Sequence, residues 1–240
     1  MILEEQLAAC LKRGTDALGI TLTPETVIVF QKYFELLEEN GKLVNLTAIT
    51  GAEDVATLHF LDSISLLNVY PFENASVIDI GSGAGFPGLP LKIANPSIEL
   101  TLLDSSGKRI SFLSALCDKI GVDAECVCSR AEDMAQDLSR REKSDIAVSR
   151  AVSKLNILCE LSLPFVRVGG VFIAMKSVSA EDELAEAQNA IDLLGARMSD
   201  CIDYQLPGTT IIHRAIIIEK IAETPVKYPR RFAKIQKSPL

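Results

Sequence analysis

Short apolar runs alternate with helical stretches over most of the chain, beginning near Ser76. The runs, rich in β-branched residues, are Val77–Ile80, Glu99–Leu103, Ala124–Cys128, Ile146–Ser149, Gly170–Met175, Met198–Gln205 and Ile211–Ile218. Helical spacing fills the intervals Gly88–Ala94, Lys108–Ile120, a short stretch after Arg130, Leu155–Val166 and Glu181–Leu194. Strands that alternate with helices form βαβ units, so the chain is expected to build a mostly parallel sheet.

The first part of the chain has a different pattern. Residues 1 to about 70 are predicted to be helical, most clearly over Pro24–Asn40, where Thr23 is the expected cap and Gly41 the expected stop. A second helix is predicted over Glu53–Val69 from its apolar spacing. We therefore divide the chain into an N-terminal helical extension (1–70), an α/β domain (71–222) and a C-terminal tail (223–240).

A glycine-rich turn follows the first predicted strand. The sequence from Val77 to Gly88 reads VIDIGSGAGFPG, an apolar strand that enters a flexible turn and then a helix. Such a turn lets the backbone approach a ligand closely at the carboxyl edge of the sheet, where doubly wound folds bind nucleoside cofactors.

Two kinds of cofactor compete for this turn. A dinucleotide loop has the spacing Gly-x-Gly-x-x-Gly, whereas here the third glycine comes one position early and Phe86 stands in the expected place. Asp79, two residues before Gly81, would repel a pyrophosphate but suits the ammonium group of a methionine moiety. The spacing, with Gly81 and Gly83 in the turn, therefore favours S-adenosylmethionine, and the strand order is that expected of a class I methyltransferase.

Two further carboxylates follow neighbouring strands. Asp104 ends the second strand, in the position of an acid that accepts hydrogen bonds from both hydroxyls of a ribose. Its alternative role is to cap the helix that begins near Lys108. Glu132, after Ala131, follows the third strand and can reach an adenine edge, although an acid there is more often a helix-start residue.

The combined motifs closely resemble the small-subunit ribosomal RNA methyltransferase G family, also called glucose-inhibited division protein B. The resemblance covers essentially the whole chain. It rests on Asn45-Leu46-Thr47, His59 to Ser63, Gly81 to Gly88, Leu103-Asp104-Ser105 with Lys108-Arg109, Ser129 to Glu132, Ser149-Arg150-Ala151 and Lys227 to Arg231.

The resemblance implies methylation of N7 of a guanine in the 530 loop of 16S ribosomal RNA, guanine 527, with S-adenosylmethionine as donor and the 30S subunit as partner. It places the family's cofactor contacts on Gly81, Phe86, Ala131, Glu132 and Arg150, with Asp104 at the ribose. It also raises His59 from a packed histidine to a candidate residue on the substrate side.

This chemistry needs no general base, because N7 of guanine carries a lone pair and no proton at neutral pH. Catalysis then consists largely of orientation, which can contribute on the order of 7 to 11 kcal/mol. Arg150, Lys176 and His59 are candidates for positioning the substrate. Basic residues at the predicted strand ends, Lys108, Arg109 and Arg130, are candidates for contacts with RNA phosphates, although each could equally form a surface ion pair.

Charge and composition narrow the picture further. The net charge is −8, but the tail from Thr224 onward holds five basic residues and no acid, which leaves 19 basic and 32 acidic residues in the first 223. No apolar run approaches the roughly 20 residues of a membrane span, and Met1–Gln6 lacks the positive charge of a signal peptide. We therefore expect a cytoplasmic protein that binds no membrane. A monomer is the expected state, although the sequence leaves the oligomeric state open.

The six cysteines lie mostly within apolar patterns, with no Cys-x-x-Cys pair and only two histidines in the chain. Neither a metal site nor a disulfide framework is expected. Three other functions remain open at this stage. They are a methyltransferase acting on a small molecule or protein, a nucleotide-binding module without turnover, and an NAD-dependent oxidoreductase, which the loop spacing disfavours.

Overall fold

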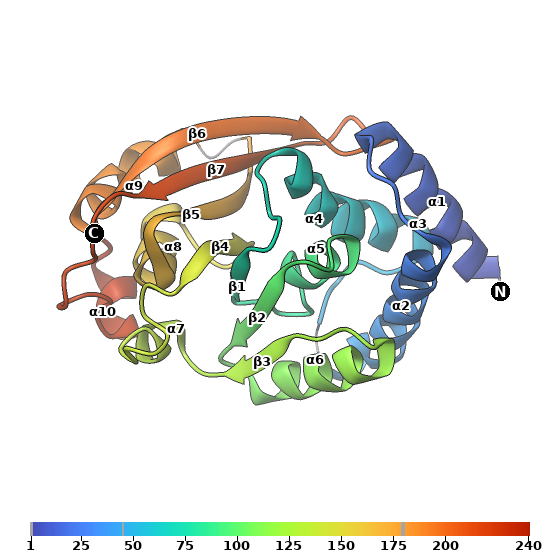
Figure 1. Cartoon of the computed structure of the whole chain (residues 1–240), viewed down its shortest axis with the longest axis horizontal. Helices are drawn as coiled ribbons and strands as arrows, with labels where there is room; N and C mark the ends of the chain where they lie inside the picture. Colours follow the sequence, from blue (N-terminus) through green and yellow to red (C-terminus); the bar gives the residue numbers. More distant parts are fainter. Residues whose placement is uncertain (1, 45, 179–180) are drawn as a thin grey trace.

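Seven strands form one sheet in the order β3-β2-β1-β4-β5-β7-β6 (Figure 1). The computed structural model describes residues 2–44, 46–178 and 181–240. The strands are β1 (Ser76–Ile80), β2 (Glu99–Asp104), β3 (Glu125–Cys128), β4 (Ser144–Arg150), β5 (Val166–Ser177), β6 (Ala196–Gln205) and β7 (Ile212–Lys220). β1 to β5 pair in parallel, and β7 is antiparallel to both β5 and β6. The predicted fold class, including the closing hairpin, is confirmed.

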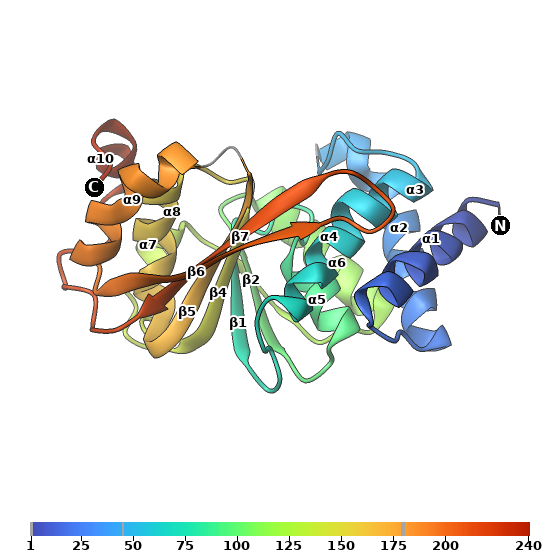
Figure 2. The ribbon, with the colours of Figure 1, turned by 90° about the horizontal axis from the view of Figure 1, so that it is seen from above.

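Helices cover both faces of the sheet (Figure 2). One layer contains α5 (Gly88–Ala94) and α6 (Gly107–Ile120), and the other α7 (Ala131–Met134), α8 (Leu155–Ser162), α9 (Glu181–Leu193) and α10 (Phe232–Lys237). β1 shows why the sheet divides the core: Val77 packs in the first layer, and Ile78 and Ile80 in the second. Alternate residues of a strand point to opposite faces, so an almost wholly apolar strand has helices on both sides.

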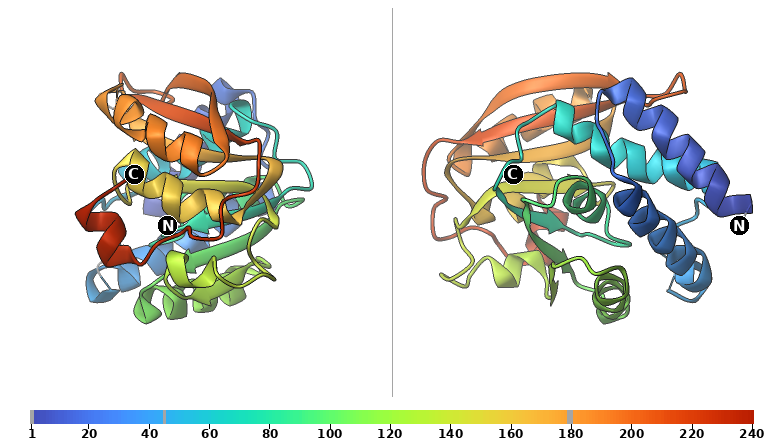
Figure 3. Two further views of the ribbon diagram at one scale, coloured as in Figure 1. Left: turned by 90° about the vertical axis from the view of Figure 1, so that its left-hand side faces the viewer. Right: turned by 45° about the vertical axis from the view of Figure 1, so that its right-hand side comes forward.

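The N-terminal residues form α1 (Ile2–Leu18) and α2 (Pro24–Val44), which lie side by side and are drawn in blue in Figure 3. The backbone amide of Thr26 donates to Thr23 Oγ1 at 3.2 Å, as expected of a cap. The predicted stop at Gly41 is wrong, because α2 continues to Val44. Glycine within a helix costs about 1 kcal/mol relative to alanine but keeps its N–H donor, so it weakens a helix without ending it.

The second predicted helix, Glu53–Val69, is a continuous helical path of mixed geometry. It consists of α3 (Ala52–Val55), a π-helical segment (Ala56–Leu61), α4 (Asp62–Ile64) and a 3₁₀ turn (Ser65–Asn68). The amide of Asp62 bonds the carbonyl of Thr57, five residues earlier. A uniform 3.6-residue period cannot reveal this wider turn. Such segments are frequent at functional sites, and His59 lies within it.

Element ends differ elsewhere for local reasons. The predicted helix Leu155–Val166 ends at Ser162 and continues as a 3₁₀ turn over Leu163–Phe165, because Pro164 lacks the N–H that an α-helix requires. β5 then begins at Val166, four residues before its predicted start at Gly170, and β7 extends to Lys220.

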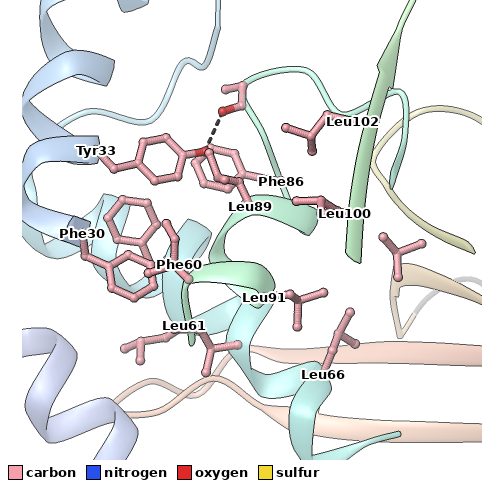
Figure 4. Packing of buried hydrophobic residues seen from close by; sticks show 14 of the residues in the cluster. Phe30, Tyr33, Phe60, Leu61, Leu66, Phe86, Leu89, Leu91, Leu100 and Leu102 are labelled. Carbon is pink, nitrogen blue, oxygen red and sulfur yellow. Dashed lines mark hydrogen bonds between the residues drawn. The ribbon is translucent and has the colours of Figure 1, made fainter. Parts of the chain in front are cut away.

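Aromatic side chains join the N-terminal helices to the sheet domain (Figure 4). Tyr33 of α2 stacks on Phe86 with ring centroids 5.6 Å apart, and Phe60 lies 5.1 Å from Tyr33. The buried Tyr33 hydroxyl donates to the carbonyl of Ala84 at 2.6 Å, within the glycine turn. The helical extension therefore shares one core with the sheet and supports the glycine turn directly.

The C-terminal tail packs against α8. Glu160 of α8 has no exposed surface, and its carboxylate accepts hydrogen bonds from the backbone and the guanidinium of Arg230. Arg141 holds the same segment by donating to the carbonyls of Tyr228 and Thr224. Part of the tail's basic charge thus neutralises a buried acid.

Replacing Arg230 tests this pair. We expect Arg230→Met to lower the free energy of unfolding by about 3 kcal/mol, because removing one partner strands a buried charge. Urea denaturation gives the change, and Arg231→Met, at the exposed neighbouring position, is the matched control with little change expected. Equal midpoints for Arg230→Met and the unmodified protein would contradict this account.

Candidate functional site

The glycine turn follows β1 and adopts backbone conformations that glycine favours. Gly81, Gly83 and Gly85 all have positive φ values, of 73°, 59° and 106°. A Cβ atom on Gly85 would also lie 2.6 Å from the hydroxyl of Tyr33. Larger residues at these positions would be strained, so the turn depends on its glycines.

A cavity of about 490 Å³ opens at the carboxyl ends of β1 to β4. The glycine turn forms one wall, and the segments after β2, β3 and β4 form the others. The predicted cofactor residues that line it are Gly81, Gly83, Phe86, Asp104, Ala131, Glu132 and Arg150. We call this space the first cavity. Its volume is in the range of small-molecule sites, about 300 to 1,000 Å³.

The carboxylate of Asp104, at the end of β2, contacts the glycine turn directly. Its Oδ2 accepts a hydrogen bond from the amide of Gly83 at 3.0 Å and one from Arg109 at 3.3 Å, while Oδ1 accepts from the amide of Ser106 at 2.8 Å. The carboxylate is buried yet lines the cavity. One side chain thus ties the turn to the end of β2 and presents acceptors to a ligand.

Asp79 lies apart from the first cavity. It is fully buried, its Oδ2 accepts from the amide of Gly88 at 2.8 Å, and Oδ1 has no partner among the described residues. Alternation along β1 explains the placement, since the next residue, Ile80, lines the cavity. Burial raises the pKa of Asp79 to about 7. Its predicted contact with an ammonium group stays a prediction.

The three predicted RNA-binding residues occupy different places. Lys108 is exposed on the first turn of α6, outside the cavity lining. Arg109 and Arg130 line the first cavity, where Arg109 contacts Asp104. Arg130 lies 3.8 Å from Glu132 and 5.6 Å above the ring of Phe232 in the tail. Arg109 and Arg130 therefore stand where the cavity meets solvent.

A second cavity, of about 530 Å³, adjoins the first. His59, Arg150 and Ala151 line both, so these residues separate the two spaces. Lys176 belongs to the second cavity alone, where its Nζ donates to the carbonyl of Ser153 and to Glu183. The three positioning candidates therefore gather at or beside the boundary between the cavities.

Arg150 is the centre of a polar network at this boundary. Its guanidinium donates to Asp62 Oδ2 at 2.9 Å, to the carbonyl of Leu58 at 2.9 Å and to His59 Nδ1 at 2.8 Å. It also lies 5.0 Å above the ring of Phe86. These contacts fix its orientation in the way that a positioning group requires.

The network also defines the state of His59. Burial and the charge of Arg150 lower the pKa of His59 to about 3, so the ring is neutral at physiological pH. Because Arg150 donates to Nδ1, the ring proton must be on Nε2, which then donates to Thr47 Oγ1 at 2.7 Å. The ring stacks on Phe86 with centroids 4.3 Å apart.

This neutral state predicts a pH effect on stability. Between pH 6.5 and 5 the unfolded chain protonates His59 while the folded chain does not, so protonation favours unfolding. We expect the unfolding free energy of the unmodified protein, relative to His59→Gln, to fall by roughly 1 kcal/mol per pH unit in this window, with the slope steepening toward pH 5. Chemical denaturation at several pH values measures the difference. Folded Asp79 stays protonated up to about pH 7, but it is present in both proteins, so its contribution cancels in the difference between their unfolding free energies. A pH-independent difference would show that folded His59 takes up a proton.

Several residues of the polar network around Arg150 were given no role by the sequence predictions. Asp62 is buried, and its Oδ1 accepts from the hydroxyl of Tyr204 at 2.9 Å and from His213 Nδ1 at 2.8 Å. This hydrogen bond raises the pKa of His213. The sequence offered one indication for Asp62: it is an acid within an apolar helical stretch, three residues after His59. Tyr204 lies on β6 and His213 on β7, both far from Asp62 in the sequence. No local sequence pattern links these two residues to Asp62. Asn45 lies outside the described residues.

Comparison with known proteins identifies the family. The family model GidB, described as rRNA small subunit methyltransferase G, matches residues 27–207. Ribosomal RNA small subunit methyltransferase G of Pelotomaculum thermopropionicum is 44% identical, and the alignment covers 98% of this chain and 99% of that protein. The methyltransferase G of Alkaliphilus oremlandii is 47% identical, with 98% of this chain and 99% of that protein covered. The crystal structure of TrmN from Thermus thermophilus, 15% identical, has a TM-score of 0.51 over 67% of this chain and 48% of its own.

The sheet order, its antiparallel closing strand and the glycine turn at the cavity define a class I methyltransferase fold. The match over most of the chain is more specific. The chain belongs to the rRNA small subunit methyltransferase G family. No helix in the described ranges is long and apolar enough to cross a membrane.

Proposed function

We propose that this protein transfers a methyl group from S-adenosylmethionine to N7 of guanine 527, in the 530 loop of 16S ribosomal RNA. The observation that carries the proposal is the pair of adjoining cavities, separated by Arg150 and His59, in a chain of this methyltransferase family. One cavity suits the methyl donor, and the other offers room for an acceptor.

The cofactor is S-adenosylmethionine, and the residues of the first cavity fit it. Asp104 offers acceptors suited to ribose hydroxyls, and Glu132, buried at the wall, offers a carboxylate suited to the adenine amino group. Ser82 Oγ, in the lining of the same cavity, has no hydrogen-bond partner among the described residues. When bound, the cofactor supplies an electrophilic methyl group on a sulfonium.

The protein's own residues would then orient the acceptor. N7 of guanine is a nucleophile without a proton to lose, so the site needs no general base, and a neutral His59 is consistent with this. Arg150, held by Asp62 and Leu58, and His59, held by Thr47, form a rigid border between donor and acceptor. Restricting the acceptor to an in-line approach is the main effect required of such a border.

RNA contacts are proposed for Lys108, Arg109 and Arg130, whose charges lie at or beside the entrance of the first cavity. Residues 1–70 are assigned as the helical extension, 71–222 as the methyltransferase domain and 223–240 as the basic tail. We propose that the protein acts in the cytoplasm as a monomer on the 30S subunit.

Transfer of labelled methyl groups to 30S subunits from a strain lacking this gene tests the function. Digestion of the RNA and nucleoside analysis should yield 7-methylguanosine at a single position in the 530 loop. Label at another atom or nucleotide would refute the acceptor assignment. Cofactor binding without transfer to RNA would favour a small molecule or protein as acceptor, an alternative consistent with the net charge of −8.

A further inference from the structure

Selection of guanine requires more than its N7 atom, because adenine presents the same acceptor at N7. The two purines differ at C6, beside N7, where guanine has the acceptor O6 and adenine an amino donor, and they differ again at N1 and C2. Guanine carries donors on N1 and on the 2-amino group, whereas adenine has a bare acceptor at N1. An acceptor for the N1–H and 2-amino donors is therefore one way for an enzyme that methylates N7 to select guanine, alongside a donor to O6.

The second cavity contains a carboxylate with spare acceptor capacity. Glu183 of α9 lines this cavity, and its Oε2 accepts from Lys176 Nζ at 2.8 Å and from the amide of Leu155 at 2.9 Å. Within the described residues, no donor is found for the other oxygen, Oε1. Burial acts to raise the pKa of Glu183, but the bonds from Lys176 and Leu155 outweigh it and hold the pKa below its usual value. The group is therefore charged at neutral pH.

The position of Glu183 matches the orientation that the reaction requires. The N7 edge of the base must face the boundary with the first cavity, at Arg150 and His59, to meet the methyl group. The N1 and 2-amino groups then point away from that boundary, toward walls that belong only to the second cavity. Glu183 and Lys176 are on those walls.

We propose that the second cavity holds the target base and that Glu183 selects guanine by accepting hydrogen bonds from its N1–H and 2-amino groups. This inference rests on the proposed guanine-N7 activity. An adenine in the same place would direct the lone pair of N1 at the carboxylate, a repulsive contact that adds to the lost bonds. Lys176 positions the carboxylate through its bond to Oε2.

A substrate lacking one of the two donors tests this role. Inosine retains N1–H, O6 and N7 but has no 2-amino group. We expect the unmodified protein to methylate 30S subunits reconstituted with inosine at the target position about 10-fold less efficiently, in kcat/KM, than those with guanine, within the range of base-specific hydrogen bonds. In Glu183→Ala, kcat/KM for guanine should fall about 10- to 100-fold, and the preference for guanine over inosine should disappear.

Glu186→Ala is the matched control. Glu186 lies on the same helix and pairs with Lys154 at 3.1 Å, but both residues are exposed and line neither cavity. This variant should keep both the rate and the preference. If Glu183→Ala does not fold, Glu183→Gln, which retains the shape and an acceptor for Leu155, should still show a reduced preference.

The outcomes separate the two proposals. Damage to the fold would lower the rates on guanine and inosine equally, so an unchanged preference in Glu183→Ala would overturn the role of Glu183 while leaving the function intact. Failure of the unmodified protein to form 7-methylguanosine would instead overturn the proposed function.

Discussion

Asp104→Ala should raise the Kd for S-adenosylmethionine about 10- to 150-fold. This range corresponds to the loss of hydrogen bonds to a charged acceptor, about 1.5 to 3 kcal/mol. The structure gives the substitution a second effect, since Asp104 also accepts from the amides of Gly83 and Ser106 and so holds the glycine turn in place. The loss should therefore lie toward the upper end of the range.

Isothermal titration calorimetry measures this change directly. Asp133→Ala is the matched control, because Asp133 is an exposed acid on the neighbouring α7 and does not line the first cavity. Asp104→Asn should be intermediate, as the amide keeps one acceptor. Unchanged affinity in a folded Asp104→Ala protein would remove Asp104 from the cofactor site.

Most of the fold could be predicted from the sequence because its signals are local. Apolar runs such as Val77–Ile80, the glycine turn and the helical spacing of α2 each act over a few residues. Where the sequence misled, a tertiary or backbone effect decided the outcome. Gly41 was tolerated within α2, and a π-helical turn over Ala56–Leu61 replaced regular helix.

The candidate site was predictable only in part. The predicted cofactor residues follow strand ends, and parallel strands bring their carboxyl ends to one edge, so their gathering around the first cavity could be foreseen. The second cavity could not, because it joins residues of the helical extension to β7 and α9. The hydrogen bond between Asp62 and His213 spans 151 positions of sequence, and no periodicity reports on such a contact.

The orientation of Asp79 also depends on its place in the strand. Spacing alone predicts an acid near the methionine moiety, whereas the alternation of side chains along β1 turns Asp79 toward the start of α5. Its bond to the amide of Gly88 fixes the far end of the turn, as Asp104 fixes the near end. Two acids on adjacent strands thus hold one loop from both sides.

Arg150→Lys should lower kcat for methyl transfer about 10²- to 10³-fold, the scale of losing one preorganised donor at a reacting centre. Lysine keeps the charge but loses the planar fork that allows Arg150 to bond Asp62, Leu58 and His59 together. His59 would then lose the donor that fixes its ring, and the border between the cavities would loosen. Affinity for S-adenosylmethionine should change less, since Asp104 and Glu132 remain in the first cavity.

Single-turnover transfer at saturating cofactor separates these effects, because it reports the chemical step apart from binding. Arg167→Lys provides the control, since Arg167 also pairs with an aspartate, Asp145, but at an exposed position on β5. If Arg150→Lys weakened cofactor binding as strongly as it slowed transfer, Arg150 would be a cofactor-binding residue of the first cavity. A selective loss of rate would instead support its role in orienting the acceptor, the effect on which a reaction without a general base most depends.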